Sequence, residues 1–290
     1  MSKHVLITGG AGFIGSHLVD AYLQRGWRVS VIDDLSTGDR RNLNPRAQFY
    51  EADVRNADIA ELRPDVISHH AAQMDVRRSV ADPVFDADVN VLGSVRLLQK
   101  AAEIGVKRFI FASTGGAIYG EPLFAPQTEA HPTYPLSPYG CAKLAVEHYM
   151  SYFRAVHGLS TIALRYANVY GPRQNSKGEA GVVAIFIERK RRGEQATING
   201  DGEQTRDFVY VGDVVAANMA VSESSDAGPL NVGTGVETSV NQLAALLGIN
   251  AAHGPAKAGE QRRSVLASKF GRTPLADGLR ETVAWFNRPR

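Results

Sequence analysis

The sequence predicts an α/β protein in which a doubly wound parallel sheet is followed by a smaller α/β domain. Short β-branched runs alternate with longer amphipathic stretches through the first half of the chain, as in βαβ units. A glycine-rich turn joins the first of these runs to the first amphipathic stretch. After Gly171, glycine, proline and charged residues interrupt shorter elements, which indicates a second domain.

The elements of the first half follow from the same periodicity. We expect strands at residues 5–8, 29–32, 48–51, 66–68, 108–112 and 161–164 and helices at 13–25, 84–104 and 138–157. Residues 206–222 again have the pattern of a strand and then a helix. The first domain is therefore expected to comprise residues 1–170 together with 206–232, while 171–205 and 233–290 form the second. Right-handed crossovers bring the loops of the first domain to one edge of the sheet.

The composition disfavours several classes of partner. The 290 residues are 44% apolar, and 32 Lys and Arg nearly balance 30 Asp and Glu, for a formal charge of +2. Such a chain can bury a sizeable core, and its charge does not favour nucleic acid or an anionic membrane. No apolar run approaches the roughly 20 residues of a membrane span, and the N-terminus is typical of a strand rather than a signal peptide. The protein is expected to be soluble and cytoplasmic.

Cysteine and histidine usage predicts neither disulfides nor a metal site. Cys141 is the single cysteine, which is compatible with a reducing compartment. The eight histidines, including His69 and His70, show no paired metal-ligand spacing, so no metal is predicted. The basic cluster at residues 189–192 could bind an anion, but a solvated helix face is the preferred interpretation.

The segment VLITGGAGFIG places Gly9, Gly12 and Gly15 directly between a strand and a helix. Glycines permit a tight turn and a close backbone approach, and the helix N-terminus presents free N–H groups and a positive dipole to a pyrophosphate. This context predicts a dinucleotide turn and, with it, a Rossmann-type domain.

Acidic residues at the end of the second strand indicate which dinucleotide binds. Asp33 can accept hydrogen bonds from the adenosine ribose hydroxyls. Together with Asp34 it would repel a 2′-phosphate, so NAD is favoured over NADP. Arg40 and Arg41 lie nearby and could offset that repulsion.

A tyrosine and a lysine lie one helical turn apart in the segment SPYGCAK. Tyr139 and Lys143 share a helix face, and Cys141 points away from it, with an expected structural role. A phenol titrates near pH 10, so about 4 kcal/mol of phenolate stabilisation is needed for it to act as a base at pH 7. A neighbouring ammonium and a nicotinamide cation would both favour the phenolate. The segment follows the expected strand and turn at 109–116, at a distance suited to the same sheet edge.

Taken together, these motifs identify a family. TGGAGFIG at residues 8–15, YGCAK at 139–143 and RYANVYGPRQ at 165–174 resemble the extended short-chain dehydrogenases/reductases, and within them the chain is most similar to the UDP-glucose (UDP-galactose) 4-epimerases. The match runs nearly the full length. It includes DVR at 53–55, HAAQ at 70–73, NVLGS at 90–94, GDGEQTRDFVYVGDV at 200–214, NVGTG at 231–235 and GEQRRS at 259–264.

The resemblance implies which residues serve the cofactor and the chemistry. Tyr139 is implied as the acid/base, Lys143 as the residue that binds the nicotinamide ribose and tunes the tyrosine, and Thr114 as the hydroxyl in place of the family's usual serine. Asp53 and Val54 are implied at the adenine end. The NAD site implied in this way comprises Gly9, Gly12, Phe13, Ile14, Gly15, Asp33, Asp34, Ser36, Thr37, Gly38, Asp53, Val54, Ala71, Ala72, Gln73, Asn90, Ser113, Tyr139, Lys143 and Tyr166.

The resemblance also implies a nucleotide-sugar site. Asn168 would contact the diphosphate, and Asn199 lies where the uracil pocket is expected. Arg206 and Arg262 would neutralise the pyrophosphate, which a guanidinium can bind with two donors. Ser264 lies where the family has a gate that is bulky in enzymes restricted to glucose and galactose, so this small residue would admit N-acetyl sugars. The substrate contacts implied are Thr114, Tyr139, Asn168, Val182, Asn199, Arg206, Arg262 and Ser264.

The residues after Thr114 indicate the reaction. Dehydratases of this family have an Asp-Glu pair directly after the serine or threonine, and related decarboxylases have a glutamate there. Gly115, Gly116 and Ala117 provide no carboxylate. This favours 4-epimerisation of a UDP-hexose, namely UDP-glucose/UDP-galactose and potentially the N-acetylated pair UDP-GlcNAc/UDP-GalNAc, through a transient 4-keto sugar.

Two other interpretations stay open. The chain could be a 4-epimerase of another nucleotide sugar, such as UDP-glucuronate. From a different class, it could be a non-catalytic NAD-binding sensor, although the intact set of Thr114, Tyr139 and Lys143 disfavours this. The resemblance further implies a homodimer formed through the helices at 84–104 and 138–157.

Overall fold

The computed structural model describes residues 2–176, 181–256 and 261–288, and the chain divides into two compact units. Unit 1 comprises Met1–Thr114, Ser137–Arg165 and Val215–Leu230, and unit 2 comprises Gly115–Leu136, Tyr166–Val214 and Asn231–Arg290. Gly259 and Glu260, which belong to the GEQRRS motif, lie outside the described residues. Within the described ranges, no helix is long and apolar enough to cross a bilayer.

Unit 1 is built on a seven-stranded sheet with the order β11-β6-β5-β4-β1-β2-β3. The six strands expected from the sequence are all present, and β11 is an additional edge strand. Chain order reverses between β1 and β4, and loops at such a switch point form a crevice at the carboxyl ends of the strands. The strands are β1 His4–Thr8, β2 Arg28–Asp33, β3 Gln48–Glu51, β4 Val66–His69, β5 Arg108–Thr114, β6 Thr161–Tyr166 and β11 Gly228–Val232.

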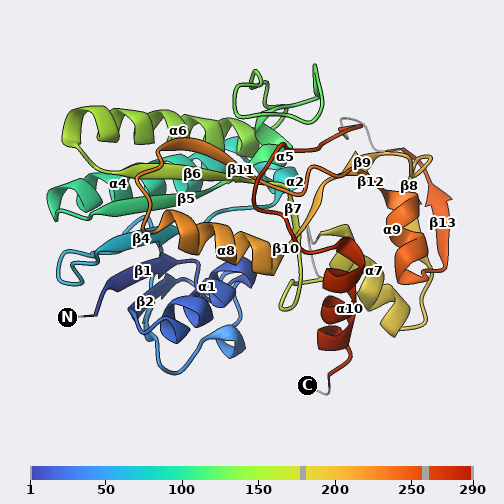
Figure 1. Cartoon of the computed structure of the whole chain (residues 1–290), viewed down its shortest axis with the longest axis horizontal. Helices are drawn as coiled ribbons and strands as arrows, with labels where there is room; N and C mark the ends of the chain where they lie inside the picture. Colours follow the sequence, from blue (N-terminus) through green and yellow to red (C-terminus); the bar gives the residue numbers. More distant parts are fainter. Residues whose placement is uncertain (1, 177–180, 257–260, 289–290) are drawn as a thin grey trace. The chain divides into compact units, whose positions relative to one another are not determined.

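Helices cover both faces of this sheet. Figure 1 shows α4 and α6 on one face and α1 with α8 on the other. Leu98, Phe109, Val146 and Phe153 form part of the core between the sheet and the α4 and α6 pair. The helical elements are α1 Phe13–Gln24, the 3-10 turn Arg40–Asn42, α2 Val76–Ala81, α3 Pro83–Ala87, the π turn Asp88–Leu92, α4 Gly93–Glu103, α6 Pro138–His157 and α8 Val211–Val221, whose first four residues belong to unit 2.

The helix expected at 84–104 is divided into three segments. It begins at Pro83 as α3, widens into the π turn, and continues as α4. Apolar periodicity does not reveal the wider turn, because the apolar face continues on either side of it. The π turn contains Asn90, which is 2% exposed and turned into unit 1.

Helix α6 has clear start and stop signals. The Ser137 hydroxyl accepts a hydrogen bond of 3.1 Å from Gly140 N, and Pro138 occupies the first turn, where its missing N–H is no loss. Gly158 ends the helix with a φ of 68°, a left-handed conformation that favours glycine. Buried residues recur at helical spacing from Lys143 through Val146 to Phe153. The sequence therefore determines which face of α6 is buried, and Lys143 lies on it.

Unit 2 combines small two-stranded sheets with four helices in the described residues. Its core includes Phe186, Ile198, Leu243 and Leu279. The elements are α5 Gly115–Ile118, β7 Asn168–Tyr170, α7 Val182–Arg191, β8 Ala196–Asn199, β9 Thr205–Arg206, β10 Phe208–Tyr210, β12 Thr238–Ser239, α9 Val240–Leu247, β13 Ala251–Gly254 and α10 Leu275–Phe286, with pairs β10-β7, β12-β9 and β13-β8.

The basic cluster at the end of α7 is a solvated, ion-paired helix end. Arg191 and Arg192 both pair with Glu188 at 2.8 Å, and Arg189 pairs with Glu194 at 2.5 Å. The arginine side chains are about half exposed. The preferred interpretation of this cluster is thus confirmed.

Candidate active site

In the turn after β1, backbone atoms lie so close to two glycines that neither position has space for a side chain. Gly9 has a φ of +71°, and a Cβ there would lie 2.7 Å from Ala71 N. A Cβ on Gly15 would lie 2.1 Å from Gly9 O. Helix α1 follows Gly12 without a side-chain cap, so the N–H groups of its first turn, which includes Phe13 and Ile14, remain available to an anion. The turn therefore fits a dinucleotide pyrophosphate.

Asp33 lies at the end of β2 and is 7% exposed. Its two carboxylate oxygens accept hydrogen bonds from Ala11 N at 2.9 Å and Leu35 N at 2.8 Å. Burial raises the pKa of this carboxyl, and the two backbone donors act in the opposite direction. Each oxygen keeps a further acceptor site for a ribose hydroxyl. Next along the chain come Asp34, which accepts from Ser36 N and Oγ, and then Thr37 and Gly38.

The two arginines that could have favoured a 2′-phosphate are both paired with carboxylates. Arg40 forms an ion pair with Glu51, and Arg41 forms one with Asp39. A 2′-phosphate would have to compete with Glu51 and Asp39 for these guanidinium groups, which agrees with the expected preference for NAD.

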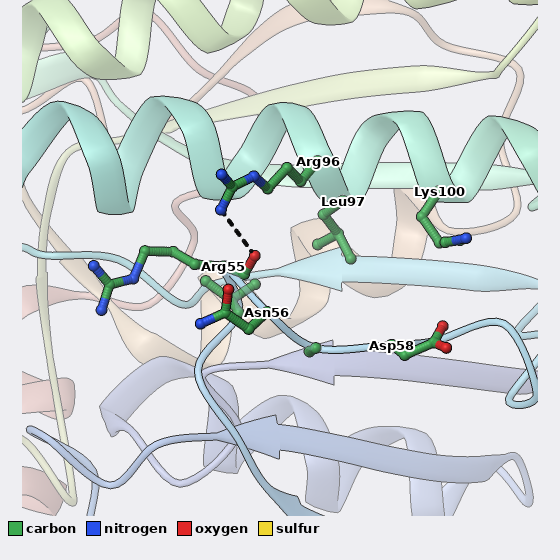
Figure 2. A pocket seen from close by; sticks show the side chains of 8 residues that line it. Arg55, Asn56, Asp58, Arg96, Leu97 and Lys100 are labelled. Atoms are coloured by element: carbon green, nitrogen blue, oxygen red, sulfur yellow. Dashed lines mark hydrogen bonds between the residues drawn. The ribbon is translucent and has the colours of Figure 1, made fainter.

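A pocket of about 200 Å³ lies beside the residues implied at the adenine end. Val54 forms part of its wall, together with residues 55–58 and the α4 residues Arg96, Leu97 and Lys100. Figure 2 shows Arg96 reaching from α4 to the Arg55 carbonyl oxygen, at 3.2 Å. The Arg55 hydrogen bond lowers the pKa of Asp53. The basic side chains of this pocket are therefore engaged: Arg55 pairs with Asp53 and Asp88, and Lys100 pairs with Glu103.

The loop after β4 and the π turn are joined by a buried amide network. Gln73 N donates to Asn90 Oδ1, and Asn90 Nδ2 donates to Gln73 O, both at 2.9 Å. These bonds fix the loop that begins with Ala71 and Ala72. Sequence reasoning identified Gln73 and Asn90, but it missed Asp86, whose Oδ1 accepts from Gln73 Nε2 and Asn90 Nδ2 at 2.9 Å each. The available signal was spacing, because Asp86 lies one helical turn before Asn90.

Tyr139 and Lys143 lie on α6 as the sequence predicts, and the Lys143 ammonium points to the end of β5. Lys143 Nζ donates to Ala112 O at 3.0 Å and lies 5.7 Å from the centroid of the Tyr139 ring. Lys143 is 3% exposed, and burial lowers its pKa to about 8. Tyr139 N donates to the Ser79 hydroxyl at 3.3 Å, which ties the start of α6 to α2.

In the protein without its cofactor, burial outweighs the expected effect of the nearby ammonium on the pKa of Tyr139. Burial raises the pKa of the phenol well above its ordinary value, and the negative charge of Asp86 raises it further. Lys143 directs a proton to Ala112 O and not to the phenol oxygen. The phenol therefore holds its proton at neutral pH until further positive charge arrives.

The end of β5 is hydrogen-bonded to a buried ion pair. Ser113 Oγ donates to Glu147 Oε1 at 2.6 Å, and Arg165 grips the same carboxylate through Nε and Nη2 at 2.6–3.2 Å. All three residues are buried. Thr114, the last residue of β5, is thereby fixed in the unit that holds Tyr139 and Lys143. Cys141 is exposed on α6, so it does not pack as the expected structural thiol would.

Apart from Thr114 and Tyr139, which belong to unit 1, the residues implied in substrate binding lie in unit 2, as does Tyr166. Thr205 N donates to Arg262 O at 2.9 Å, which brings the strand of Arg206 beside Arg262. Gln204 Nε2 donates to Asn199 O at 3.1 Å, so Asn199 belongs to the same group. Asn168 starts β7, and Val182 starts α7.

Two features of this group are not visible in the sequence. Arg262 is bound by both oxygens of Asp201, at 2.7 and 2.9 Å, so this cation already has an anionic partner. Ser264 is 1% exposed, and its hydroxyl has no hydrogen-bond partner in the part of the chain that the structure describes. In those same ranges, no cluster of His, Cys, Asp and Glu is arranged to hold a metal ion.

Comparison with known proteins places these features in a family. Residues 5–233 match the model of the "NAD dependent epimerase/dehydratase family". The chain is 44% identical to the UDP-glucose 4-epimerase of Mycolicibacterium smegmatis, over 97% of both chains.

Two solved structures share the fold over 98% of both chains. The UDP-glucose 4-epimerase of Thermotoga maritima, solved with UDP-glucose, is 46% identical with a TM-score of 0.94. That of Thermus thermophilus, solved as a complex with NAD, is 42% identical with a TM-score of 0.91. The chain thus belongs to the NAD dependent epimerase/dehydratase family of extended short-chain dehydrogenases/reductases, as its motifs predict.

Proposed function

We propose that this protein is an NAD-dependent 4-epimerase of UDP-hexoses, with UDP-glucose and UDP-galactose as its substrates. The observation that carries the proposal is the α6 face that bears Tyr139 and the buried Lys143, held in the same unit as the dinucleotide turn and Thr114. Unit 1 is proposed as the NAD-binding domain and unit 2 as the nucleotide-sugar-binding domain.

The cofactor contacts are proposed on the fit of the turn. Gly9 and Gly15 permit the tight turn that leads to the uncapped start of α1, where a pyrophosphate can bind, and Asp33 offers acceptors to the adenosine ribose. NAD held there would supply a hydride acceptor for the sugar C4–H and a hydride donor for the 4-keto sugar. Lys143 is proposed to donate to the nicotinamide ribose through one of the ammonium hydrogens that do not bind the Ala112 carbonyl.

Tyr139 is the proposed acid and base. It accepts the proton of the sugar 4-hydroxyl as the C4–H bond breaks, and it gives that proton back after the 4-keto sugar has turned. Thr114 donates or accepts a hydrogen bond at the same oxygen. Because burial favours the neutral phenol, the positive charges of Lys143 and the cofactor must stabilise the phenolate for the first step. Proton and hydride are both restored, so the cycle needs no outside oxidant.

Epimerisation is preferred over elimination or decarboxylation because the residues after Thr114 offer no second acid or base. Gly115 and Gly116 begin α5 with no carboxylate in its first turn. A Cβ on Gly115 would lie 2.4 Å from the end of the Leu266 side chain, so a larger residue there requires that side chain to shift. The group that dehydratases and decarboxylases of the family have at this position is therefore not available for a further proton transfer.

The N-acetylated substrates are a second candidate, favoured by Ser264. Its buried hydroxyl has an unused donor, and serine is smaller than the bulky gate that the resemblance implies for enzymes restricted to glucose and galactose. We infer that UDP-GlcNAc and UDP-GalNAc are also accepted. Arg206 and Arg262 are proposed to bind the diphosphate, which in the case of Arg262 means exchanging Asp201 for the ligand.

We further infer a homodimer through the outer faces of α3, the π turn and α6. Val84, Leu92, Tyr152 and Val156 are 49–77% exposed there, which is unusual for large apolar side chains unless a partner covers them. The expected cytoplasmic location stays a prediction.

A substrate panel tests the proposal. The purified protein is incubated separately with UDP-glucose, UDP-GlcNAc and UDP-glucuronate, and the 4-epimers are resolved by chromatography. Interconversion of the first supports the proposal, and conversion of UDP-glucuronate alone would favour the rival epimerase. No conversion of any substrate, with NAD bound, would favour the non-catalytic sensor.

A further inference from the structure

Asp86 is a buried acid whose charge has no cationic hydrogen-bond partner among the described residues. It lies on α3 and is 1% exposed. Both of its hydrogen bonds are to neutral amides, and both reach Oδ1. The other oxygen, Oδ2, is buried without a hydrogen-bond partner in the described part of the chain. An ionised carboxylate in this position is costly unless a positive charge nearby compensates for it.

That positive charge is Lys143. Helix α3 and the π turn both pack against α6, and Lys143 is itself buried with a neutral carbonyl as its acceptor. The two groups interact electrostatically in unit 1. The negative charge of Asp86 opposes the effect of burial on the pKa of Lys143, and the positive charge of Lys143 opposes the effect of burial on the pKa of Asp86.

Several other charged groups around α6 have partners of their own or are neutral. Burial lowers the pKa of His69 and His70 so far that both rings are neutral at pH 7. Arg78 lies over the Phe85 ring, at 4.1 Å from its centroid. The ion pairs among the elements packed against α6 are Glu147 with Arg165, Asp88 with Arg55, and Lys100 with Glu103.

We propose that Asp86 is a positioning residue that sets the charge of the Lys143 and Tyr139 pair. Its buried carboxylate keeps Lys143 protonated and, through the same field, makes Tyr139 harder to deprotonate. The role of Tyr139 as a base rests on the proposed function, whereas the charge of Lys143 does not. Asp86 acts through its charge on Lys143 and Tyr139.

Asp86→Asn isolates the charge, because the amide keeps Oδ1 as the acceptor for both Gln73 and Asn90 and replaces only the unbonded oxygen. The matched control is Asp88→Asn, which removes a carboxylate two residues away that is paired with Arg55. Lysine-specific isotope labelling and NMR give the titration midpoint of the Lys143 side chain, which is assigned with a Lys143→Met sample. This readout needs no substrate.

In Asp86→Asn we expect the titration midpoint of Lys143 to fall by about 1 pH unit. This is the low end of the range of pKa shifts that a nearby opposite charge causes. The midpoint in Asp88→Asn should match that of the parent protein. The pH profile of kcat/KM for epimerisation should then shift to lower pH on both limbs in Asp86→Asn. If Asp86 had only a structural role, Asp86→Asn would lower the maximum of the kcat/KM profile and would not shift its limbs along the pH axis.

A Lys143 midpoint that is equal in Asp86→Asn and in the parent overturns the proposal, whatever the activity. If the midpoint falls but no sugar nucleotide is converted by the parent protein, the proposed function fails while the inference about Asp86 stands. If Asp86→Asn does not fold, Asp86→Glu is used instead, because it keeps the negative charge on a longer side chain. The titration midpoint of Lys143 in Asp86→Glu must then stay within about 0.3 pH unit of that in the parent, which is much less than the shift expected when the charge is lost.

Discussion

The Lys143 ammonium donates a 3.0 Å hydrogen bond to the carbonyl oxygen of Ala112, which connects the buried face of α6 to the carboxyl end of β5. Two residues beyond Ala112 lies Thr114, and one helical turn before Lys143 lies Tyr139. The three side chains are thus fixed in one unit by elements whose sequence signals are strong. The chemical role of this connection can be tested by substitution.

Tyr139→Phe removes the phenol oxygen and keeps the ring. We expect kcat for epimerisation to fall by at least about 10²-fold, the usual range for loss of a general acid or base. The NAD content, measured as nucleotide released on denaturation, should be unchanged. Tyr149→Phe, on an exposed position of the same helix, is the control and should keep full activity. Normal turnover by Tyr139→Phe would remove Tyr139 from the mechanism.

Gly15→Ala places a Cβ 2.1 Å from Gly9 O, so the turn must deform. We expect NAD affinity to fall by about tenfold or more, which corresponds to ~1.4 kcal/mol. Gly12→Ala is the graded comparison, because its Cβ would lie 3.1 Å from the same oxygen and needs only a small shift. Calorimetric titration of nucleotide-free protein with NAD measures both. Equal affinity in all three proteins would mean that the pyrophosphate does not approach this turn.

Ser264→Tyr enlarges a side chain that is 1% exposed. The ratio of kcat/KM for UDP-GlcNAc to that for UDP-galactose is expected to fall, because the larger side chain excludes the N-acetyl group first. Ser264→Ala should leave that ratio unchanged, and thermal unfolding of each variant checks that the fold is intact. Equal losses on both substrates in a folded Ser264→Tyr protein would argue against the gate.

The buried His69 makes stability depend on pH. Burial lowers its pKa well below the ordinary value, and that of His70 to about 3. Between about pH 6.5 and 3 the unfolded chain takes up these protons and the folded chain does not, so the free energy of unfolding falls as pH falls. Each ring contributes a slope of up to ~1.4 kcal/mol per pH unit.

Urea unfolding at several pH values between about 7.5 and 5, which span the ordinary histidine pKa, measures this slope. We expect it to be shallower in His69→Gln, while His148→Gln, at an exposed position, should retain the parent slope. An unchanged slope in His69→Gln would show that His69 does not titrate on unfolding.

The sequence predicts the parts of this molecule that depend on local chemistry. The first six strands, the caps of α6 and the glycine turn all follow from short-range patterns. Strand β11 was missed because its sequence, GPLNV, has one β-branched residue and begins with Gly-Pro, so only pairing with β6 makes it a strand.

The electrostatics of the site could not be predicted in the same way. Asp86 is an ordinary helical aspartate in the sequence, and only the packing of α3 against α6 buries it and directs its charge toward Lys143. The raised pKa of Tyr139 has the same origin, since burial depends on contacts between segments far apart in the chain. The pairing of Arg262 with Asp201 likewise joins residues sixty-one positions apart.

The central claim is that hydride leaves C4 of the sugar and returns to the same carbon without exchange. UDP-galactose deuterated at C4 is incubated with the purified protein, and the UDP-glucose formed is analysed by mass spectrometry and NMR. We predict conversion with deuterium retained at C4 and no net reduction of NAD. Loss of the label to solvent, or the absence of UDP-glucose, would contradict the claim.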